Sequence, residues 1–305
     1  YFTESKADAD YPVYGGSNMY QFIYNSDYFD LEEPKYWSVE EDVNPDKSAK
    51  RRVREKNMSI LKKEIHSQFG GDETSKSKKG FVNDLLREHR GEPLKLNDVK
   101  LDCTDYRIVF RCITKSTNER TFVASMIPPG IICYHALTTI RPFRFNPKEE
   151  DLSNEHLHSA YDKHLSDRES FALLGLLNSI PFDFLMRTKI DVNISKYKFE
   201  YSPLPYLSSS TEWFEEIWTR SARLNCYGEE FEEMRDRLGG IEPATGDQER
   251  QEIQAELDAA AFHAYGLDRK ETEFVLDDFY QVQNPRMMTD EYFDLVLEKY
   301  DELSD

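Results

Sequence analysis

The middle of the chain alternates between apolar runs typical of strands and short polar breaks. Residues 106–113 and 121–127 are rich in β-branched and aromatic side chains, which favour extended structure. Residues 114–120 between them are polar and suit a hairpin connection. Pro128-Pro129-Gly130 ends the second run, and the sheet is expected to resume over residues 131–137. This pattern predicts a hairpin followed by a further strand.

Apolar positions recur at helical spacing in the second half of the chain. The helices predicted there span residues 166–178, 211–224, 247–264, 268–279 and 289–300. Ser166 and Ser210 stand where the N-caps of the first two are expected, because a serine side chain can accept a hydrogen bond from a free backbone N–H. One more strand is expected over residues 190–201, ended by Pro203.

These elements predict an α+β fold, in which a mixed β-sheet domain has flanking helices and a helical C-terminal appendage. The first residues are expected to be extended and loop-like, with a tight turn at Gly15-Gly16. The predicted segments are a junction at 1–45, a polar and basic helical insertion at 46–95, a core at 96–207 and a helical C-terminal region at 208–305.

Charge gives conflicting indications about the partner. The net charge is −19, which is unfavourable for a nucleic-acid partner because neutralisation of phosphates normally dominates affinity. Residues 47–90, expected to form helices broken at Gly70-Gly71, are nevertheless basic, and much of the acid lies in the last eighty residues. The run at 47–63 is either a solvated basic helix or a direct DNA contact.

Motifs of the common enzyme classes are missing from the sequence. It has no GxGxxG after a strand, no GxxxxGK[ST], no GxSxG and no HExxH. The four cysteines form no CxxC pair, so we expect reduced thiols and a cytoplasmic protein. His156, His158 and His164 are either a metal site or part of a solvated segment. On these residues, a catalytic site within the chain is not expected.

The chain has neither a membrane-spanning run of roughly 20 apolar residues nor a signal sequence at its start. It opens with Tyr1-Phe2-Thr3-Glu4, which we interpret as the middle of a longer protein. We therefore expect no membrane partner.

Several blocks of sequence stand in a definite order along the chain. They are YPVYGGSNMYQF at 11–22, an Arg-x-x-x-Arg-x-Ile strand at 107–113 with TNERT at 117–121, an apolar strand ending in Pro-Pro-Gly-Ile at 122–131, LLGLLNSIPFD at 173–183, a segment ending in Pro-Leu-Pro at 187–205, and Ala-Glu-Leu-Asp with Ala-Tyr-Gly-Leu within 255–267. In this order they resemble the C-terminal region of large DNA adenine methyltransferases, the type IIG restriction–modification and the BREX and DISARM phage-defence enzymes. The chain departs from that pattern at Ser17, where the family has a lysine, and over 46–95, which has no counterpart.

The resemblance implies a target-recognition region that reads double-stranded DNA for an adenine-N6 methyltransferase whose own N-terminal catalytic domain is missing here. S-adenosylmethionine is implied as the cofactor of that catalytic domain, which flips the target adenine out of the duplex, and no cofactor is implied for this chain. Base edges are read by arginine, asparagine and glutamine side chains. The candidate DNA-binding residues are Tyr14, Gly15, Gly16, Gln21, Arg107, Arg111, Asn118, Arg120, Asn178, Ser179, Arg187, Lys189 and Lys196.

Structural roles remain open for several of these residues. Arg120 either contacts DNA or has a structural role, in which it pairs with Glu119 or holds the hairpin. Asn178-Ser179 either face DNA or end a helix. Arg107 and Arg111 share one strand face, which is either turned to DNA or covered by partner charges. Two rival functions are a protein-interaction module that docks other defence-system subunits and a nuclease, which lacks a convincing carboxylate–lysine constellation.

Overall fold

The computed structural model describes residues 3–4, 6, 9–25, 29–39, 48–190, 192–282 and 285–304. The described residues form ten α-helices and eight short strands, which confirms the α+β prediction. Parts of the predicted junction at 1–45 and the start of the insertion lie outside the described residues. No helix in the described part of the chain is long and apolar enough to cross a bilayer.

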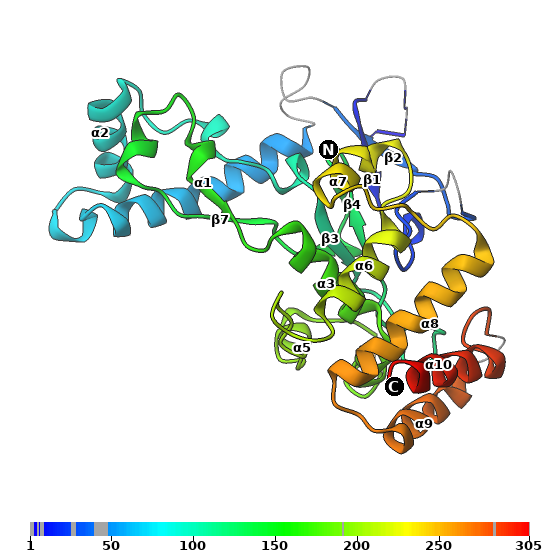
Figure 1. The fold of residues 1–305 in the computed structure, drawn as a ribbon. Coiled ribbons are helices and arrows are strands. Elements are labelled where there is room, and N and C mark those ends of the chain that lie inside the picture. Colours follow the sequence, from blue (N-terminus) through cyan, green and yellow to red (C-terminus); the bar gives the residue numbers. More distant parts are fainter. Residues whose placement is uncertain are drawn as a thin grey trace.

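Two three-stranded sheets occupy the centre of the molecule (Figure 1). In one, β3 (Arg107–Arg111) pairs antiparallel with β4 (Ala124–Ile127) and with β6 (Leu137–Thr139), which confirms the hairpin. In the other, β1 (Tyr11–Tyr14) pairs with β2 (Tyr36–Ser38) and, in parallel, with β5 (Ile132–Cys133). The chain from 131 to 139 therefore resumes pairing in both sheets.

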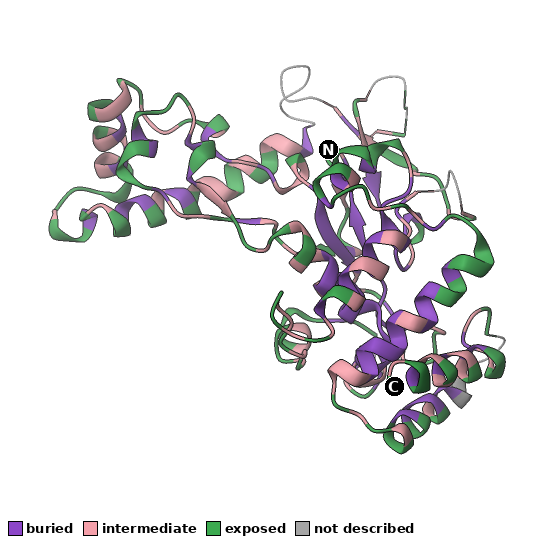
Figure 2. Ribbon diagram, in the orientation of Figure 1, coloured by how far each residue is buried: buried purple, intermediate pink, exposed green. Residues whose placement is uncertain are grey.

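Three helices cover the sheets and continue into the C-terminal lobe. These are α3 (Asp167–Asn178), α6 (Phe214–Asn225) and α8 (Asp247–Ala264). Their buried faces join the strands in one large apolar core, seen as the purple region of Figure 2. The shorter α4 (Ile180–Arg187) and α7 (Glu232–Arg237) complete this body.

The C-terminal lobe has a core of its own. Helices α9 (Arg269–Asp277) and α10 (Asp290–Glu302) pack with α8 and with Ile180 of α4. Asp268 and Thr289 cap the two helices by accepting backbone N–H bonds, so the predicted helices at 268–279 and 289–300 are confirmed within a few residues.

A two-helix arm projects from the body (Figure 1). It contains α1 (Ala49–Gln68) and α2 (Lys78–Arg90), as predicted on both sides of Gly70-Gly71. The arm also takes in a second stretch of chain, because Leu152 and Leu157 share its apolar core with Ile65, Val82 and Leu86. The ladder of β7 (Phe143–Phe145) with β8 (Tyr161–Lys163) joins this second stretch to the body.

A buried ion pair fastens the two stretches of the arm to each other. Arg90 Nη2 lies 2.7 Å from Asp98 Oδ2, with both side chains almost fully buried. Asp98 also accepts hydrogen bonds from the backbone N–H groups of Lys95 and Leu157. These bonds satisfy the buried carboxylate, as the cost of burying a charge requires.

The strand predicted at 190–201 is wrong. Residues 196–200 form a short helix, α5 (Lys196–Glu200), which Ser195 caps through the N–H of Lys198. In the described part of this stretch, one bridge, between Ile113 and Asn193, links it to the chain that follows β3. The N-cap at Ser195 favours a helix over residues 196–200, in which Phe199 packs on the core. These contacts outweigh the preference of the apolar residues at 190–194 for a strand.

The start of the helix predicted at 211–224 is also misplaced. Helix α6 begins at Phe214, after the cap residue Trp213, whereas Ser210 is not a cap. The side chain of Thr211 bonds with the backbone N–H and C=O of Ser208, and this local turn takes up the residues before the helix. Ser166 does cap α3, in a capping box with Glu169.

Candidate nucleic-acid interface

Arg120 lies in the interior and ties the hairpin to the C-terminal lobe. Its side chain is 1% exposed, and Nη2 lies 3.3 Å from Asp258 Oδ2 of α8, so its partner is Asp258 and not Glu119. Asp258 also accepts bonds from Tyr292 Oη and from the N–H of Ile180, both at 2.7 Å. Burial raises the pKa of the Asp258 carboxyl, and the Arg120 guanidinium opposes that shift.

The hairpin tip is clamped from two sides. Arg187 forms an ion pair with Asp183 at 2.8 Å and donates to the backbone C=O groups of Ser116, Asn118 and Glu119. One carboxylate oxygen of Glu119 accepts the consecutive N–H groups of residues 286–288. The planar guanidinium suits Arg187 to this multiple carbonyl contact, and the tip is held in one conformation.

Two asparagines cover the outer edge of β4. The Asn178 side chain exchanges two 2.9 Å hydrogen bonds with the backbone of Ala124, and Asn225 at the end of α6 does the same for Met126. Both amides therefore take the place of a neighbouring strand and satisfy an edge that would otherwise be unpaired. Gln21 adds a bond from Nε2 to the C=O of Asn178 at 3.0 Å. Asn225 was missed in the sequence because nothing marks its distant partner.

Ser179 ends α3 and also precedes α4. Its hydroxyl donates to the C=O of Leu176 at 2.7 Å, and its side chain is fully buried. The structure thus favours the interpretation that Asn178-Ser179 end a helix, because both side chains form hydrogen bonds inside the protein.

The β3 face that carries Arg107 and Arg111 is largely covered. Arg107 is buried, and its Nη2 donates to the C=O of Ile131. Arg111 is half-buried over the ring of Tyr20, and burial lowers its pKa while Tyr20 opposes the shift. A Cβ on Gly16 would lie 3.4 Å from Arg111 Cδ, so the turn packs against the Arg111 side chain.

The loop at 14–18 is held by hydrogen bonds within the loop and by the burial of Tyr14. The N–H of Gly15 donates to Asn18 Oδ1 at 2.6 Å, while the ring of Tyr14 is buried in the main core. These contacts form the tight turn predicted at Gly15-Gly16.

The remaining predicted residues are accessible. Lys196 is 85% exposed on its side chain and lies 3.4 Å from Glu200, an exposed pair of small energetic weight. Asn118 is exposed at the hairpin tip, and Lys189 donates to Ser202 Oγ at 3.1 Å. Their contact with DNA stays a prediction.

The strongest positive charge of the chain lies on the arm. Residues 49–90 hold twelve lysines and arginines against six acidic residues, a net charge of +6 in a chain of −19. Arg52, Lys56 and Lys63 are exposed on α1, and their spacing of four and seven residues puts them on one helix face. That face lies opposite the buried Leu61 and Ile65, so it is turned to solvent.

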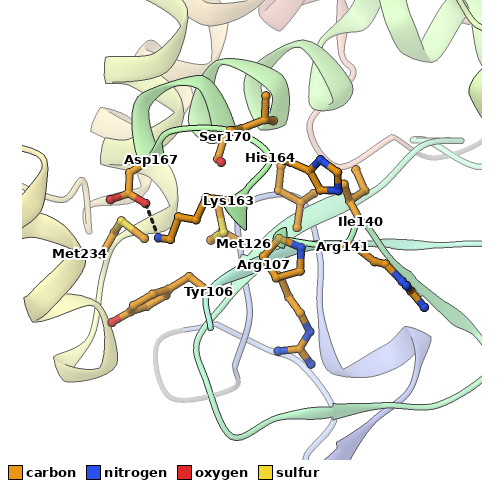
Figure 3. A pocket seen from close by; sticks show the side chains of 13 residues that line it. Tyr106, Arg107, Met126, Ile140, Arg141, Lys163, His164, Asp167, Ser170 and Met234 are labelled. Atoms are coloured by element: carbon orange, nitrogen blue, oxygen red, sulfur yellow. Dashed lines mark hydrogen bonds and ion pairs between the residues drawn. The ribbon is translucent and has the colours of Figure 1, made fainter. Parts of the chain in front are cut away.

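A cavity of about 200 Å³ lies where the arm meets the body (Figure 3). It is lined by residues of β3 and β4, by the start of α3 and by the segment around Arg141. Lys163 stands inside it, 3.3 Å from Asp167 and 3.8 Å from Asp105, so acidic side chains neutralise its charge.

Metal ligands are not gathered anywhere in the described part of the chain: no three His, Cys, Asp or Glu side chains stand close enough to hold an ion. His158 instead bonds the C=O of Asn97 at 2.7 Å, and its pKa is lowered by burial. The four cysteines, all described, are free thiols.

Comparisons with known proteins give no further indication of function. No family model, no curated protein and no solved structure matches the chain.

Proposed function

We propose that the chain is the DNA-recognition part of an S-adenosylmethionine-dependent DNA adenine-N6 methyltransferase of restriction–modification or phage defence. Its partners would be double-stranded DNA and its own methyltransferase domain, in the cytoplasm. The proposal combines the ordered sequence blocks of the methyltransferase family with the placement of charge on the molecule. Adenine chemistry and cofactor binding would belong to the methyltransferase domain and not to this chain.

The observation that carries the proposal is the basic arm on an acidic protein. A protein of net charge −19 is repelled by DNA at long range unless its positive charge is concentrated on one element. The stripe of Arg52, Lys56 and Lys63 spans eleven residue steps of α1, or about 16 Å of helix. Such a row of cations can follow successive phosphates of one strand, which fixes register without reading sequence.

The buried residues give the proposed interface its rigidity. Arg187 and Glu119 hold the hairpin tip, and Arg120 attaches it to α8. The exposed Asn118 at that tip is therefore presented on a fixed backbone. Pre-organisation of this kind lowers the entropy lost on binding.

Duplex binding across a range of salt concentrations tests the proposal. In fluorescence anisotropy with a labelled duplex, we expect the double variant Lys56→Ala/Lys63→Ala to reduce the slope of log affinity against log salt by about two, since each lost phosphate contact removes about one counterion. The matched control is Arg168→Ala/Lys270→Ala, which removes two exposed cations outside the arm. Its slope should equal that of the original chain.

Absence of duplex binding at low salt, or equal slopes for the test and control variants, would overturn the proposal. In the first case the acidic C-terminal helices would favour a protein-interaction module instead. Adenine methylation is measured separately, with this chain joined to its methyltransferase domain and S-adenosylmethionine supplied. We expect the arm variant to methylate more slowly as salt is raised, while the control variant follows the original protein.

A further inference from the structure

Three tyrosines stand out from the body within a stretch of ten residues. Tyr197, Tyr201 and Tyr206 are 68%, 70% and 83% exposed, more than most large apolar side chains of a folded protein. In the view of Figure 1, α5 and the loop after it project on the same side of the molecule as the arm. Ile113 and Val192 are also exposed, and the N–H of Thr114 donates to the C=O of Val192. Apolar side chains gathered at one surface mark an interaction site.

The backbone beneath these rings is firmly anchored. Phe199 points inward and stacks on Phe110, with ring centroids 4.7 Å apart. Before the helix, the N–H of Ile194 donates to the C=O of Cys112 at 2.8 Å. After it, Ser202 is held by Lys189 at 3.1 Å. Phe199 points inward and lies in sequence between Tyr197 and Tyr201, whose rings point outward. The exposed tyrosines are therefore carried by an ordered backbone.

The geometry and charge of this surface define its ligand. The rings of Tyr197 and Tyr201 are in contact, with centroids 4.5 Å apart and planes 35° apart, so a planar group can stack on the outer face of the pair but not between them. Lys196 and Lys198 alternate with the aromatic residues along the chain. Aromatic faces with interleaved cations are the arrangement that holds unpaired bases and the adjoining phosphates.

We infer that the α5 tyrosine surface, formed by Tyr197, Tyr201 and Tyr206 with Lys196 and Lys198, is a stacking platform for unpaired bases of single-stranded DNA. This inference rests on the proposed function for its choice of DNA as the ligand. It adds a second contact, in which the tyrosine rings stack on unpaired bases and do not bind paired ones. The arm would hold phosphates of the duplex, and the α5 tyrosine surface would hold a locally opened strand.

The test compares a fully paired duplex with the same duplex carrying unpaired bases at its centre. We expect the chain to bind the opened duplex more tightly, and Tyr197→Ala/Tyr201→Ala to lose about tenfold or more of the affinity for it, because each stacked ring contributes about 5- to 150-fold. Affinity for the paired duplex should stay unchanged. Tyr197→Phe/Tyr201→Phe retains both ring faces and should bind the opened duplex as the original chain does.

Phe274→Ala, which removes a ring that is 70% exposed on α9, is the matched control and should change neither affinity. Equal binding of the opened duplex by the alanine variant and the original chain would overturn the inference, and so would an equal loss in the phenylalanine variant. If the paired duplex is bound through the arm without any preference for the opened one, this inference fails while the proposed function stands. If single-stranded DNA is bound and the duplex is not, the inference stands while the proposed function fails.

Discussion

At the scale of single residues, buried polar groups need hydrogen-bond partners inside the protein, whereas exposed polar groups can bond to water. Arg120, Asp258 and Tyr292 connect the hairpin, α8 and α10 in one buried network. Both charges are nearly inaccessible to water, so each depends on the other for compensation. The same residue types at the surface, such as Lys196 with Glu200, contribute little.

Removal of one member of this network should be costly. We expect Asp258→Ala to lower the free energy of unfolding by about 3–5 kcal/mol, because Arg120 is left buried without its counter-charge. Urea unfolding followed by circular dichroism measures the loss. The paired variant Arg120→Met/Asp258→Asn removes both charges and should recover much of the stability, because the amide can still bond to Tyr292 Oη and to the N–H of Ile180. A loss below about 1 kcal/mol in the single variant would contradict a buried charge pair.

At the scale of elements, helix α3 is fitted closely to α6. A Cβ placed on Gly175 would lie 2.7 Å from Ile217 Cγ2 and 3.3 Å from the Ile217 carbonyl oxygen. Gly175 therefore allows the two helix backbones to approach each other. This packing brings Asn178 and Asn225, at the ends of the two helices, to the same strand edge.

Gly175→Ala separates two opposing effects. Helix propensity alone favours alanine over glycine by about 1 kcal/mol in a helix interior. We expect the contact with Ile217 to prevail, with a net loss of about 1–3 kcal/mol from overpacking. Thermal unfolding measures the balance, and Ile217→Leu in the same background should restore part of the loss, because leucine lacks the branched Cγ2 methyl that meets the new Cβ. A raised melting temperature for the single variant would show that α3 and α6 can move apart freely.

At the scale of the whole molecule, the arm and the body differ in the size of their cores. The arm is held by five buried apolar residues and the Arg90–Asp98 pair, whereas the body shares one large cluster from β1 to α8. Local opening requires less free energy where fewer apolar contacts are lost. The arm is thus a weakly supported element, and its residues 49–90 carry a net charge of +6.

Hydrogen exchange should reveal this difference. We expect amides of α1 and α2 to exchange faster than those of α3 and α8, measured by mass spectrometry at equal temperature and pH. Leu86→Ala should accelerate exchange throughout the arm, including residues 152–157, and leave α3 and α8 unchanged. Equal protection of arm and body would instead show that the arm opens only when the whole chain unfolds.

The sequence by itself determined the local elements, for a local reason. Capping at Ser166 and the hydrophobic spacing after it place α3, and the polar break at 114–120 places the hairpin, because both signals lie within a few residues of the structure they direct. The basic character of the arm is likewise visible in composition. The helix at 196–200 was mistaken for a strand because Ile190, Val192 and Ile194, just before it, alternate with polar residues as in a strand.

Only the tertiary structure decided which polar side chains are accessible. Arg120 and Asp258 stand 138 positions apart, and Asn225 lies 99 positions from its partner Met126. No local pattern encodes such pairs, since they arise when separate elements pack and must satisfy one another's buried polar groups. For the same reason Leu152 and Leu157 could not be assigned to the arm from the sequence. Packing also left Tyr197 and Tyr201 outside, because the core admits only Phe199 from that helix.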